Sequence, residues 1–303
     1  MLQKTDKIWV DGKFVNWDDA RIHILTPSLH YGDAAFEGIR FYNTDKGPAI
    51  FRLKEHIDRL FYSSSVFEMK IPFSKNELVE AVRDTVRINK IKEGYIRPIA
   101  IFGYGSMGLK HTKEAPVHVY IAVWPWGAYL GKDAVRIKTS NFIRIHPKST
   151  IADAKISGHY INSILASLEV KKHGYDEALL LDYEGNIAEG PGENLFLVKN
   201  NSLITPPLKR QILAGITRDS VIKIAKDLEI RVEERDLKLK DVYNADEAFY
   251  TGTAVEITSI KELDDKIIGS GKIGKLIEML KKEFLDIVHG KNKKYENWLT
   301  YAY

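Results

Sequence analysis

The sequence predicts an α+β protein built from two domains. Its 303 residues exceed the roughly 100 to 200 residues of a usual domain. Apolar runs with strand character alternate along the chain with segments of helical periodicity. Midway, the segment WPWGAYLGKD (124–133) interrupts this pattern with one proline and two glycines. We therefore expect a small N-terminal α/β domain at 1–124, a linker at 125–133 and a larger C-terminal domain at 134–303.

The N-terminal part begins with a predicted β-hairpin. Asp11 and Gly12 separate two apolar runs in KIWVDGKFVNW, and Asp-Gly in this position is a strong signal for a two-residue turn. Spacing of the apolar residues predicts the elements that follow. These are a strand leading into a helix, a second helix and two strands, at 49–67, 75–89, 95–105 and 117–124.

The C-terminal part continues with both kinds of element. A helix is predicted at 159–174, with Gly174 as its stop and four apolar residues on one face, Ile161, Ile164, Leu165 and Leu168. Two hairpins are expected to turn at Glu184-Gly185 and at Asn200-Asn201. The other predicted elements are a strand, a helix, a strand–loop–strand unit and a final helix, at 134–145, 217–228, 246–260 and 272–288.

Composition limits the classes of protein. Hydrophobic residues make up 44% of the chain, as in ordinary globular proteins, and no stretch approaches the ~20 apolar residues that span a bilayer. The polar N-terminus, MLQKTDK, lacks the apolar core of a signal peptide, so we expect a cytoplasmic location. The absence of cysteine excludes disulfides, thiol nucleophiles and cysteine-ligated metals. The net charge of +4 is small and the charges are mixed, so neither a nucleic acid nor a membrane partner is expected.

Three features predict a pyridoxal phosphate site. Lys155 lies among small residues in IADAKISGHY, which would let a flat ring approach the backbone. Glu189 begins EGPGENLF, and the glycine in AGITRD precedes a predicted helix. A lysine can form a Schiff base, an acid can face a pyridine nitrogen, and a helix N-terminus binds phosphate. Spacing alone also allows a surface lysine and a plain helix cap, because charged residues make up 28% of the chain.

The surrounding segments resemble the branched-chain amino acid aminotransferases, which belong to the class IV pyridoxal phosphate-dependent aminotransferases. The resemblance extends from about Lys7 to about Leu285, with its motifs in the same order. The motifs are LHYGDAAFEGIR, EHIDRL, YIRP, WPWGAYLG, GENLF, GITRD and TGTAVEIT. The resemblance implies a two-domain class IV fold, similar to that of D-amino acid aminotransferase.

The resemblance also implies the residues that hold the cofactor. Lys155 matches the catalytic lysine, Tyr160 the contact to the ring hydroxyl, and Glu189 the acid at the pyridine nitrogen. Glu193, a rival acid, is expected to brace the turn. Thr217 is expected to cap its helix as well as bind phosphate. The implied phosphate contacts are Arg59, Gly215, Ile216, Thr217 and Thr253.

The substrate pocket implied by the resemblance belongs to the N-terminal domain and has an aromatic wall. Its predicted members are Tyr31, Phe36, Trp126 and Tyr129, any of which, seen alone, could be a core residue. Gly38 matches a position where the backbone approaches the substrate. Tyr95, Thr253 and Ala254 match the α-carboxylate site. Arg97 would meet the second carboxylate of glutamate, which an enzyme with an apolar pocket must also accept.

The predicted activity is the reversible transfer of an amino group between L-leucine, L-isoleucine or L-valine and 2-oxoglutarate. The resemblance implies a homodimer whose pocket borrows a loop from the partner. Another class IV enzyme stays open: a D-amino acid or R-amine aminotransferase, or an aminodeoxychorismate lyase. YIRP and GAYL favour the branched-chain group. A catalytically inactive binding protein that kept the fold is a more distant alternative.

GYGSMG (103–108) matches G-x-G-x-x-G, the pattern of an NAD(P)-dependent oxidoreductase. A dinucleotide site needs a helix there and an acid about 20 residues further on. The segment after it contains Pro116 and leads into a strand, so we expect a loop near the substrate pocket. The histidines form no HExxH motif, and no metal is expected.

Overall fold

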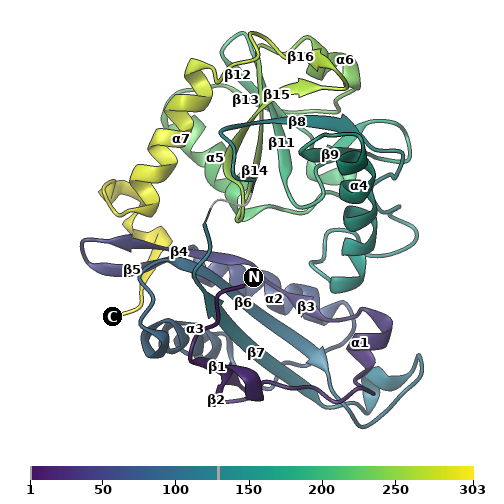
Figure 1. The fold of residues 1–303 in the computed structure, drawn as a ribbon, viewed down its shortest axis with the longest axis vertical. Helices are drawn as coiled ribbons and strands as arrows, with labels where there is room; N and C mark the ends of the chain where they lie inside the picture. The colour runs from purple at the N-terminus through teal and green to yellow at the C-terminus, as the bar shows by residue number, and fades with distance from the viewer. Residues whose placement is uncertain (1, 128–129) are drawn as a thin grey trace. The chain divides into compact units, whose positions relative to one another are not determined.

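The computed structural model describes residues 2–127 and 130–303 (Figure 1). The chain forms two compact units. The first comprises Met1–Gly127, Ala154–Gly158 and Asp286–Tyr303, and the second comprises Ala128–Asp153 and His159–Leu285. The domains expected from sequence are contiguous, whereas these units are not. The segment around Lys155 and the C-terminal residues belong to the first unit, because both pair with its strands.

In the described part of the first unit, eight strands form one sheet in the order β17-β5-β4-β6-β7-β1-β2, with β3 paired to β6. Neighbouring strands are antiparallel. The strands are β1 (Lys7–Val10), β2 (Lys13–Asn16), β3 (Ala35–Phe36), β4 (Ile39–Thr44), β5 (Gly47–Phe51), β6 (Gly94–Phe102), β7 (Val117–Trp124) and β17 (Leu299–Tyr301).

Two helices, α2 (Leu53–Ser65) and α3 (Lys75–Asn89), pack with one face of this sheet around a common core. The core includes Leu60 from α2, Val82 from α3 and Ile96 from β6. Helix α3 begins with a capping box, in which Ser74 and Glu77 each accept a backbone N–H of the other. The remaining helices of the unit are short: α1 (Pro27–Tyr31), η1 (Trp17–Asp19), η2 (His111–Lys113) and η5 (Lys293–Trp298).

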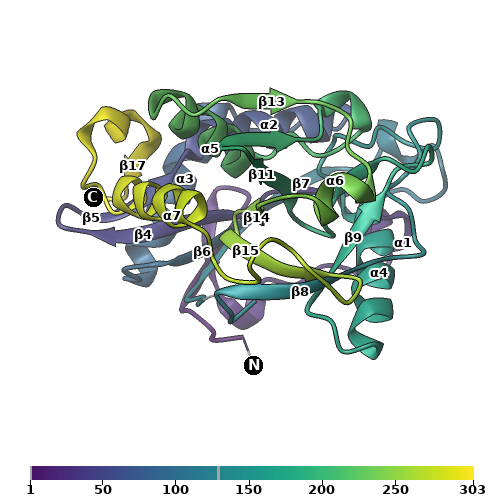
Figure 2. The same ribbon diagram turned by 90° about the horizontal axis from the view of Figure 1, so that it is seen from above.

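The described strands of the second unit form a nine-stranded mixed sheet in the order β10-β9-β8-β15-β14-β11-β12-β13, with β16 paired to β15. Figure 2 shows β8 beside β15, with which it pairs in parallel. The strands are β8 (Ala134–Thr139), β9 (Glu177–Leu181), β10 (Ile187–Glu189), β11 (Asn194–Lys199), β12 (Ser202–Thr205), β13 (Val232–Glu234), β14 (Glu247–Gly252), β15 (Glu256–Leu263) and β16 (Lys266–Ile267). Its core includes Val135, Leu195 and Tyr250.

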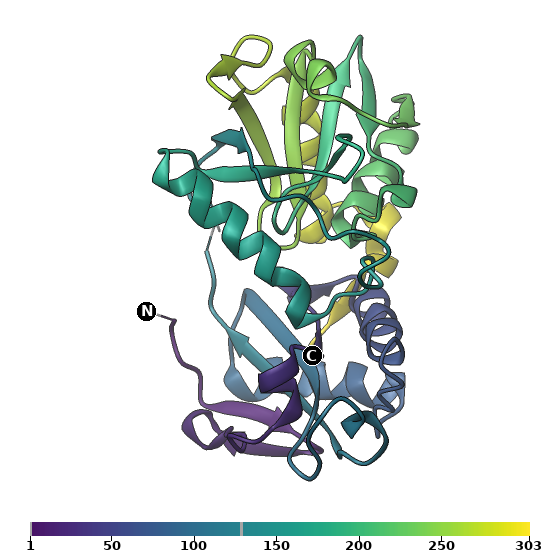
Figure 3. The ribbon, with the colours of Figure 1, turned by 90° about the vertical axis from the view of Figure 1, so that its right-hand side faces the viewer.

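The helices of the second unit are α4 (Tyr160–Lys172), α5 (Ile216–Asp227), α6 (Leu239–Tyr243), most of α7 (Lys275–Val288) and η4 (Leu208–Arg210). The short helix η3 (Ser157–His159) begins in a segment of the first unit and ends at the first residue of a segment of the second. The apolar face predicted for the helix at 159–174 is not in the core. Ile161 and Ile164 are 60% and 56% exposed, and Leu165 and Leu168 are exposed as well. Figure 3 shows α4, in teal, with one side turned away from the strands of its unit.

Two of the three predicted hairpin turns have the expected backbone. Asp11 and Gly12 both have positive φ, 47° and 88°, as a type I′ turn requires. Asn200 and Asn201 do the same between β11 and β12, with φ of 49° and 59°. Between β9 and β10 the Gly185 N–H donates to the Asp182 carbonyl at 3.1 Å, so that turn centres on Tyr183-Glu184, one residue before the predicted Glu184-Gly185. No α-helix follows GYGSMG, which leads through a loop and η2 into β7, as expected. None of the helices in the described ranges has the length and apolar character needed to cross a bilayer.

Candidate active site

The first unit holds Lys155 by its backbone. The Lys155 N–H donates to Ser63 Oγ of α2 at 2.9 Å, and its carbonyl accepts the N–H of Phe36 at 3.2 Å. Ile156 forms a β-bridge with Ala35. The Lys155 side chain is half-buried, and its Nζ lies 5.0 Å from the centre of the Phe36 ring. The backbone of Lys155 is therefore fixed through both its N–H and its carbonyl, while its side chain faces an aromatic residue predicted to line the substrate pocket.

Arg59 is held by a buried carboxylate that the sequence analysis did not single out. Glu37 accepts Arg59 Nε at 2.7 Å and Nη2 at 2.9 Å, and His56 Nδ1 lies 2.7 Å from the same carboxylate. The Glu37 side chain is fully buried. Burial alone would raise its pKa, but the charge of Arg59, together with the hydrogen bonds of Arg59 and His56, holds that pKa well below the usual range. Burial lowers the pKa of His56, so the neutral ring donates from Nδ1.

Phe36, Tyr95, Arg97 and Trp124 share the face of the first sheet opposite the helices. Tyr95 and Arg97 alternate with core residue Ile96 along β6, and Trp124 pairs with Tyr95 across to β7. The Arg97 guanidinium carbon lies 4.8 Å from the ring centre of Phe36, 5.5 Å from that of Tyr95 and 6.0 Å from that of Trp124. These distances are typical of cation–π contacts. The Trp126 ring closes the cluster, 4.5 Å from Tyr95.

The packing of the Tyr95 side chain requires glycine at position 38. A Cβ at position 38 would lie 1.9 Å from the Tyr95 hydroxyl oxygen, closer than any real contact. Glycine therefore lets the hydroxyl end of Tyr95, a residue that is 6% exposed, lie directly on the backbone at position 38. The expected approach of the Gly38 backbone to the substrate stays a prediction.

Tyr31 lies on α1, 42% exposed, and stacks on His111 with ring centres 5.4 Å apart. Its hydroxyl accepts the N–H of Gly108 from the GYGSMG loop at 3.2 Å. His111 in turn pairs with the buried Asp33, Nε2 to Oδ2, at 2.6 Å. These contacts fix Tyr31 to the GYGSMG loop. The predicted wall residue Tyr129 lies outside the described residues.

In the second unit, Glu189 is a buried acid with several donors. Arg144 Nε donates to its Oε1 at 2.5 Å, Asn194 Nδ2 to Oε2 at 3.0 Å and the Leu213 N–H to Oε2 at 3.1 Å. The Arg144 cation stabilises the ionised carboxylate against the cost of burial. Glu193, the rival acid, accepts the N–H of Gly192 and so braces the turn.

The N-terminus of α5 adjoins Glu189 through Asn194. Asn194 Nδ2 also donates to the Leu213 carbonyl at 3.0 Å, and a Cβ on Gly215 would lie 2.0 Å from Asn194 Oδ1. The expectation that Thr217 caps the helix is wrong. Helix α5 begins at Ile216 with Gly215 as the N-cap, and no side chain caps it. Thr217, 4% exposed, lies in the first turn, where N–H groups and the helix dipole favour an anion.

The remaining predicted residues occupy two places in the second unit. Thr253 and Ala254 form the turn between β14 and β15, and both are half-buried. Tyr160 is the first residue of α4 and is half-buried. The structure brings Glu189 close to the α5 N-terminus and leaves the role of each of these three residues a prediction.

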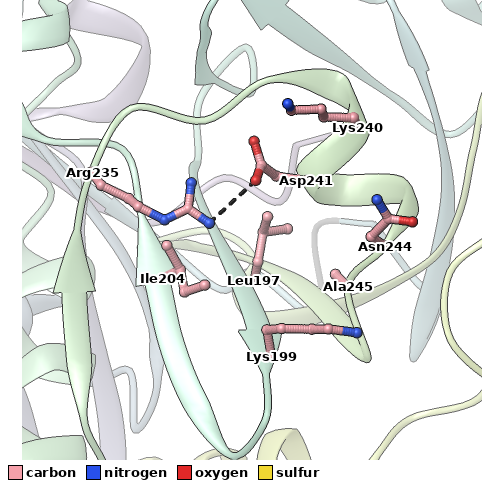
Figure 4. A pocket seen from close by; sticks show the side chains of 8 residues that line it. All are labelled: Leu197, Lys199, Ile204, Arg235, Lys240, Asp241, Asn244 and Ala245. Atoms are coloured by element: carbon pink, nitrogen blue, oxygen red, sulfur yellow. Dashed lines mark hydrogen bonds and ion pairs between the residues drawn. The ribbon is translucent and has the colours of Figure 1, made fainter.

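A surface pocket of about 300 Å³ lies elsewhere on the second unit (Figure 4). Leu197 and Ile204 provide apolar surface, and the Arg235 guanidinium is bonded to Asp241. Lys199 and Lys240 are at its edge, and Lys199 is paired with Asp246. None of the predicted site residues lines this pocket, and its cations are largely neutralised by neighbouring acids.

Comparison with known proteins identifies the family. Residues 34–263 match the family described as Amino-transferase class IV. The chain belongs to the class IV aminotransferases. It is 44% identical to the branched-chain-amino-acid aminotransferase of Pseudomonas aeruginosa, over 99% of this chain and 98% of that protein.

Two solved structures of class IV aminotransferases show the same fold. The crystal structure of the Escherichia coli branched-chain amino acid aminotransferase has a TM-score of 0.97 and 40% identity, covering 99% of this chain and 100% of that one. The T.th. enzyme complexed with N-(5'-phosphopyridoxyl)-L-glutamate has a TM-score of 0.96 and 44% identity, covering 99% of each chain. These findings confirm the two-sheet class IV fold and the predicted cofactor, pyridoxal phosphate.

The residues present fit this cofactor. A buried acid that pairs with an arginine suits a protonated pyridine nitrogen, and an uncapped helix N-terminus led by glycine suits a phosphate.

Sequence reasoning missed four residues. Glu37, Arg144 and Asn194 each hold a predicted site residue, and His56 holds Glu37. One signal was available: Glu37 stands in AAFEGI, where a lone acid within an apolar run suggests a buried partner.

Proposed function

We propose that this class IV aminotransferase transfers the amino group between L-leucine, L-isoleucine or L-valine and 2-oxoglutarate, giving branched-chain 2-oxo acids and L-glutamate. Arg97 carries the proposal. Its guanidinium lies against three aromatic rings, and no carboxylate of the described residues pairs with it. An aliphatic side chain needs the rings, and the second carboxylate of glutamate needs the cation. The names of the similar proteins support the same substrates.

Lys155 would act as the general base that removes the proton from the substrate's α-carbon. When bound, pyridoxal phosphate supplies an electron-withdrawing ring that stabilises the negative charge left on that carbon. The hydrogen bonds of the Lys155 peptide to Ser63 and Phe36 fix the start of its side chain. Proton transfer depends on such positioning, since the donor and acceptor must reach hydrogen-bond distance.

Glu189 would hold a proton on the ring nitrogen, and Tyr160 would meet the ring hydroxyl. Arg144 and Asn194 support this role, because the Arg144 cation pairs with the Glu189 carboxylate and both side chains fix its orientation. The phosphate would be bound by Arg59, Thr253, the N-cap residue Gly215 and the first turn of α5, which contains Ile216 and Thr217. In that turn, the absence of a side-chain cap supports an anion site.

Substrate binding would fall to the sheet face around Arg97. Phe36 and Trp126 would contact the aliphatic side chain, together with Tyr31 and Tyr129. Tyr95 and the turn at Thr253 and Ala254 would bind the α-carboxylate. The close packing of Tyr95 on Gly38 supports the first of these contacts, since it fixes the hydroxyl at the backbone.

We infer that the enzyme is a homodimer. The exposed apolar side chains of α4, Ile161, Ile164, Leu165 and Leu168, lie in one row on the helix. Such a row is typical of a surface that a partner covers, and a twofold axis would let the same row meet itself. The cytoplasmic location stays a prediction.

Replacement of Arg97 by leucine tests the proposed substrate pair. Hydrogen bonds to charged groups are worth roughly 10- to 100-fold in affinity, so Arg97→Leu should lower kcat/KM for L-glutamate by about that factor. For L-leucine, kcat/KM should change by less than about threefold, because the rings remain. The control is Arg231→Leu, which removes an exposed arginine of the second unit. Equal losses for both amino acids would contradict the selective role of Arg97.

A further inference from the structure

Two buried N–H groups in the first unit have no hydrogen-bond partner among the described residues. They are Arg97 Nε and Trp124 Nε1. Trp124 is only 8% exposed, so water has little access to its indole N–H. A buried polar group without a partner costs free energy, and native proteins contain few of them. Each such group therefore needs an explanation.

The two groups belong to one cluster on one sheet face. Trp124 is directly opposite Tyr95 in the β6–β7 pairing, and Tyr95 and Arg97 are two residues apart on the same strand. The guanidinium carbon of Arg97 lies 6.0 Å from the centre of the Trp124 ring. Both unpaired groups are hydrogen-bond donors, because the guanidinium and indole nitrogens carry hydrogens and cannot accept a hydrogen bond. What the cluster lacks is an acceptor.

The rings explain the apolar part of the pocket without using these donors. Phe36, Tyr95 and Trp124 can contact an aliphatic side chain through their faces. A leucine side chain would leave both N–H groups unpaired, whereas a carboxylate brings several lone pairs and could accept from both. Of the two substrate types, only the dicarboxylate can therefore accept hydrogen bonds from both N–H groups.

We propose that Trp124 is a specificity-determining residue whose indole N–H donates, together with Arg97, to the distal carboxylate of the dicarboxylic substrate. The ligand is a five-carbon dicarboxylate, either the amino acid or the 2-oxo acid. This inference rests on the proposed function, in which both substrate types use the sheet face around Arg97. It adds a neutral donor to the cation, and neutral donors help to fix the orientation of a carboxylate.

Trp124→Phe tests the proposal because it removes the N–H and keeps an aromatic ring. We would measure the binding of two unreactive ligands to the holoenzyme by calorimetry: glutarate, a dicarboxylate, and 4-methylvalerate, an aliphatic monocarboxylate. The Kd of glutarate should rise about 10-fold or more, while the Kd of 4-methylvalerate should change by less than about threefold. Trp9→Phe is the matched control, since Trp9 is equally buried in the same unit and packs on Phe73.

An unchanged Kd for glutarate would overturn the proposal, and so would equal losses for both ligands, which indicate a merely structural role. If Trp124→Phe does not fold, benzothienylalanine incorporated at position 124 keeps the ring shape and lacks only the N–H. An unchanged Kd for glutarate, or equal losses for both ligands, would overturn the proposal in that variant too. A wild-type enzyme that binds neither ligand, or does not transaminate L-leucine, would instead refute the proposed function.

Discussion

At the scale of single residues, the Glu37 carboxylate determines how Arg59 is held. It is fully buried, with two bonds from Arg59 and one from His56. Removing one partner of a buried ion pair leaves the other charge uncompensated. Glu37 also stands between Phe36 and Gly38, so its bonds to α2 fix the segment that carries these two predicted substrate residues.

Glu37→Gln should lower the free energy of unfolding by about 3 to 5 kcal/mol at neutral pH, because Arg59 loses its charged partner. The folded state lowers the pKa of Glu37, so its contribution is present above the unfolded value of about 4.3 and is lost as the pH falls below it. The difference between wild type and variant should therefore shrink on acidification.

Urea unfolding of the apoenzyme between pH 3 and pH 7 would measure this difference. The control is Glu80→Gln, since the Glu80 side chain is 54% exposed and its pair with Arg83 lies on the surface of α3. A difference that stays constant with pH would show that Glu37 is not a charged partner of Arg59.

At the scale of elements, the N-terminus of α5 depends on a contact that only glycine allows. A Cβ on Gly215 would lie 2.0 Å from Asn194 Oδ1, and Asn194 also donates to Glu189. Gly215→Ala should therefore displace Asn194 and weaken cofactor binding about 10-fold or more, as the loss of a hydrogen bond to a charged group does. Equilibrium dialysis against pyridoxal phosphate would give the Kd.

Gly192→Ala is the matched control, because a Cβ at Gly192 meets no atom within 4 Å. It should bind the cofactor as wild type does. If Gly215→Ala bound pyridoxal phosphate with unchanged affinity, the α5 N-terminus would not be the phosphate site.

Local elements could be predicted from sequence, because their signals are local. The turns at Asp11-Gly12 and Asn200-Asn201 need positive φ at two adjacent residues, and the residue types state this directly. The placement of Lys155 in the first unit could not be predicted, because it depends on the pairing of Ile156 with Ala35, more than a hundred residues away. The ion pairs of Glu37 with Arg59 and of Arg144 with Glu189 could not be predicted either, because each joins separate segments of the chain that only the fold brings together. The resemblance pointed to Lys155, Glu189 and Arg97, while their supporting partners became visible only in three dimensions.

At the scale of the whole molecule, the apolar row on α4 predicts self-association. Wild type should sediment at twice the chain mass of 34.6 kDa or as a multiple of that dimer. Ile161→Asp combined with Ile164→Asp places two charges on the row and should give a monomer, since charges are excluded from the core of an interface. Ile267→Asp, an equally exposed isoleucine on β16, should leave the mass unchanged. A double variant with the wild-type mass would contradict the use of α4 in the interface.

The central claim, that this enzyme uses Lys155 to move amino groups from branched-chain L-amino acids, is tested by one spectrum. We would record the near-visible absorbance of the holoenzyme before and after L-leucine, and again after 2-oxoglutarate. The account predicts that L-leucine converts the cofactor to its pyridoxamine form and that 2-oxoglutarate restores it, in wild type and not in Lys155→Ala. Conversion by D-leucine but not by L-leucine, or conversion in Lys155→Ala at the wild-type rate, would contradict it.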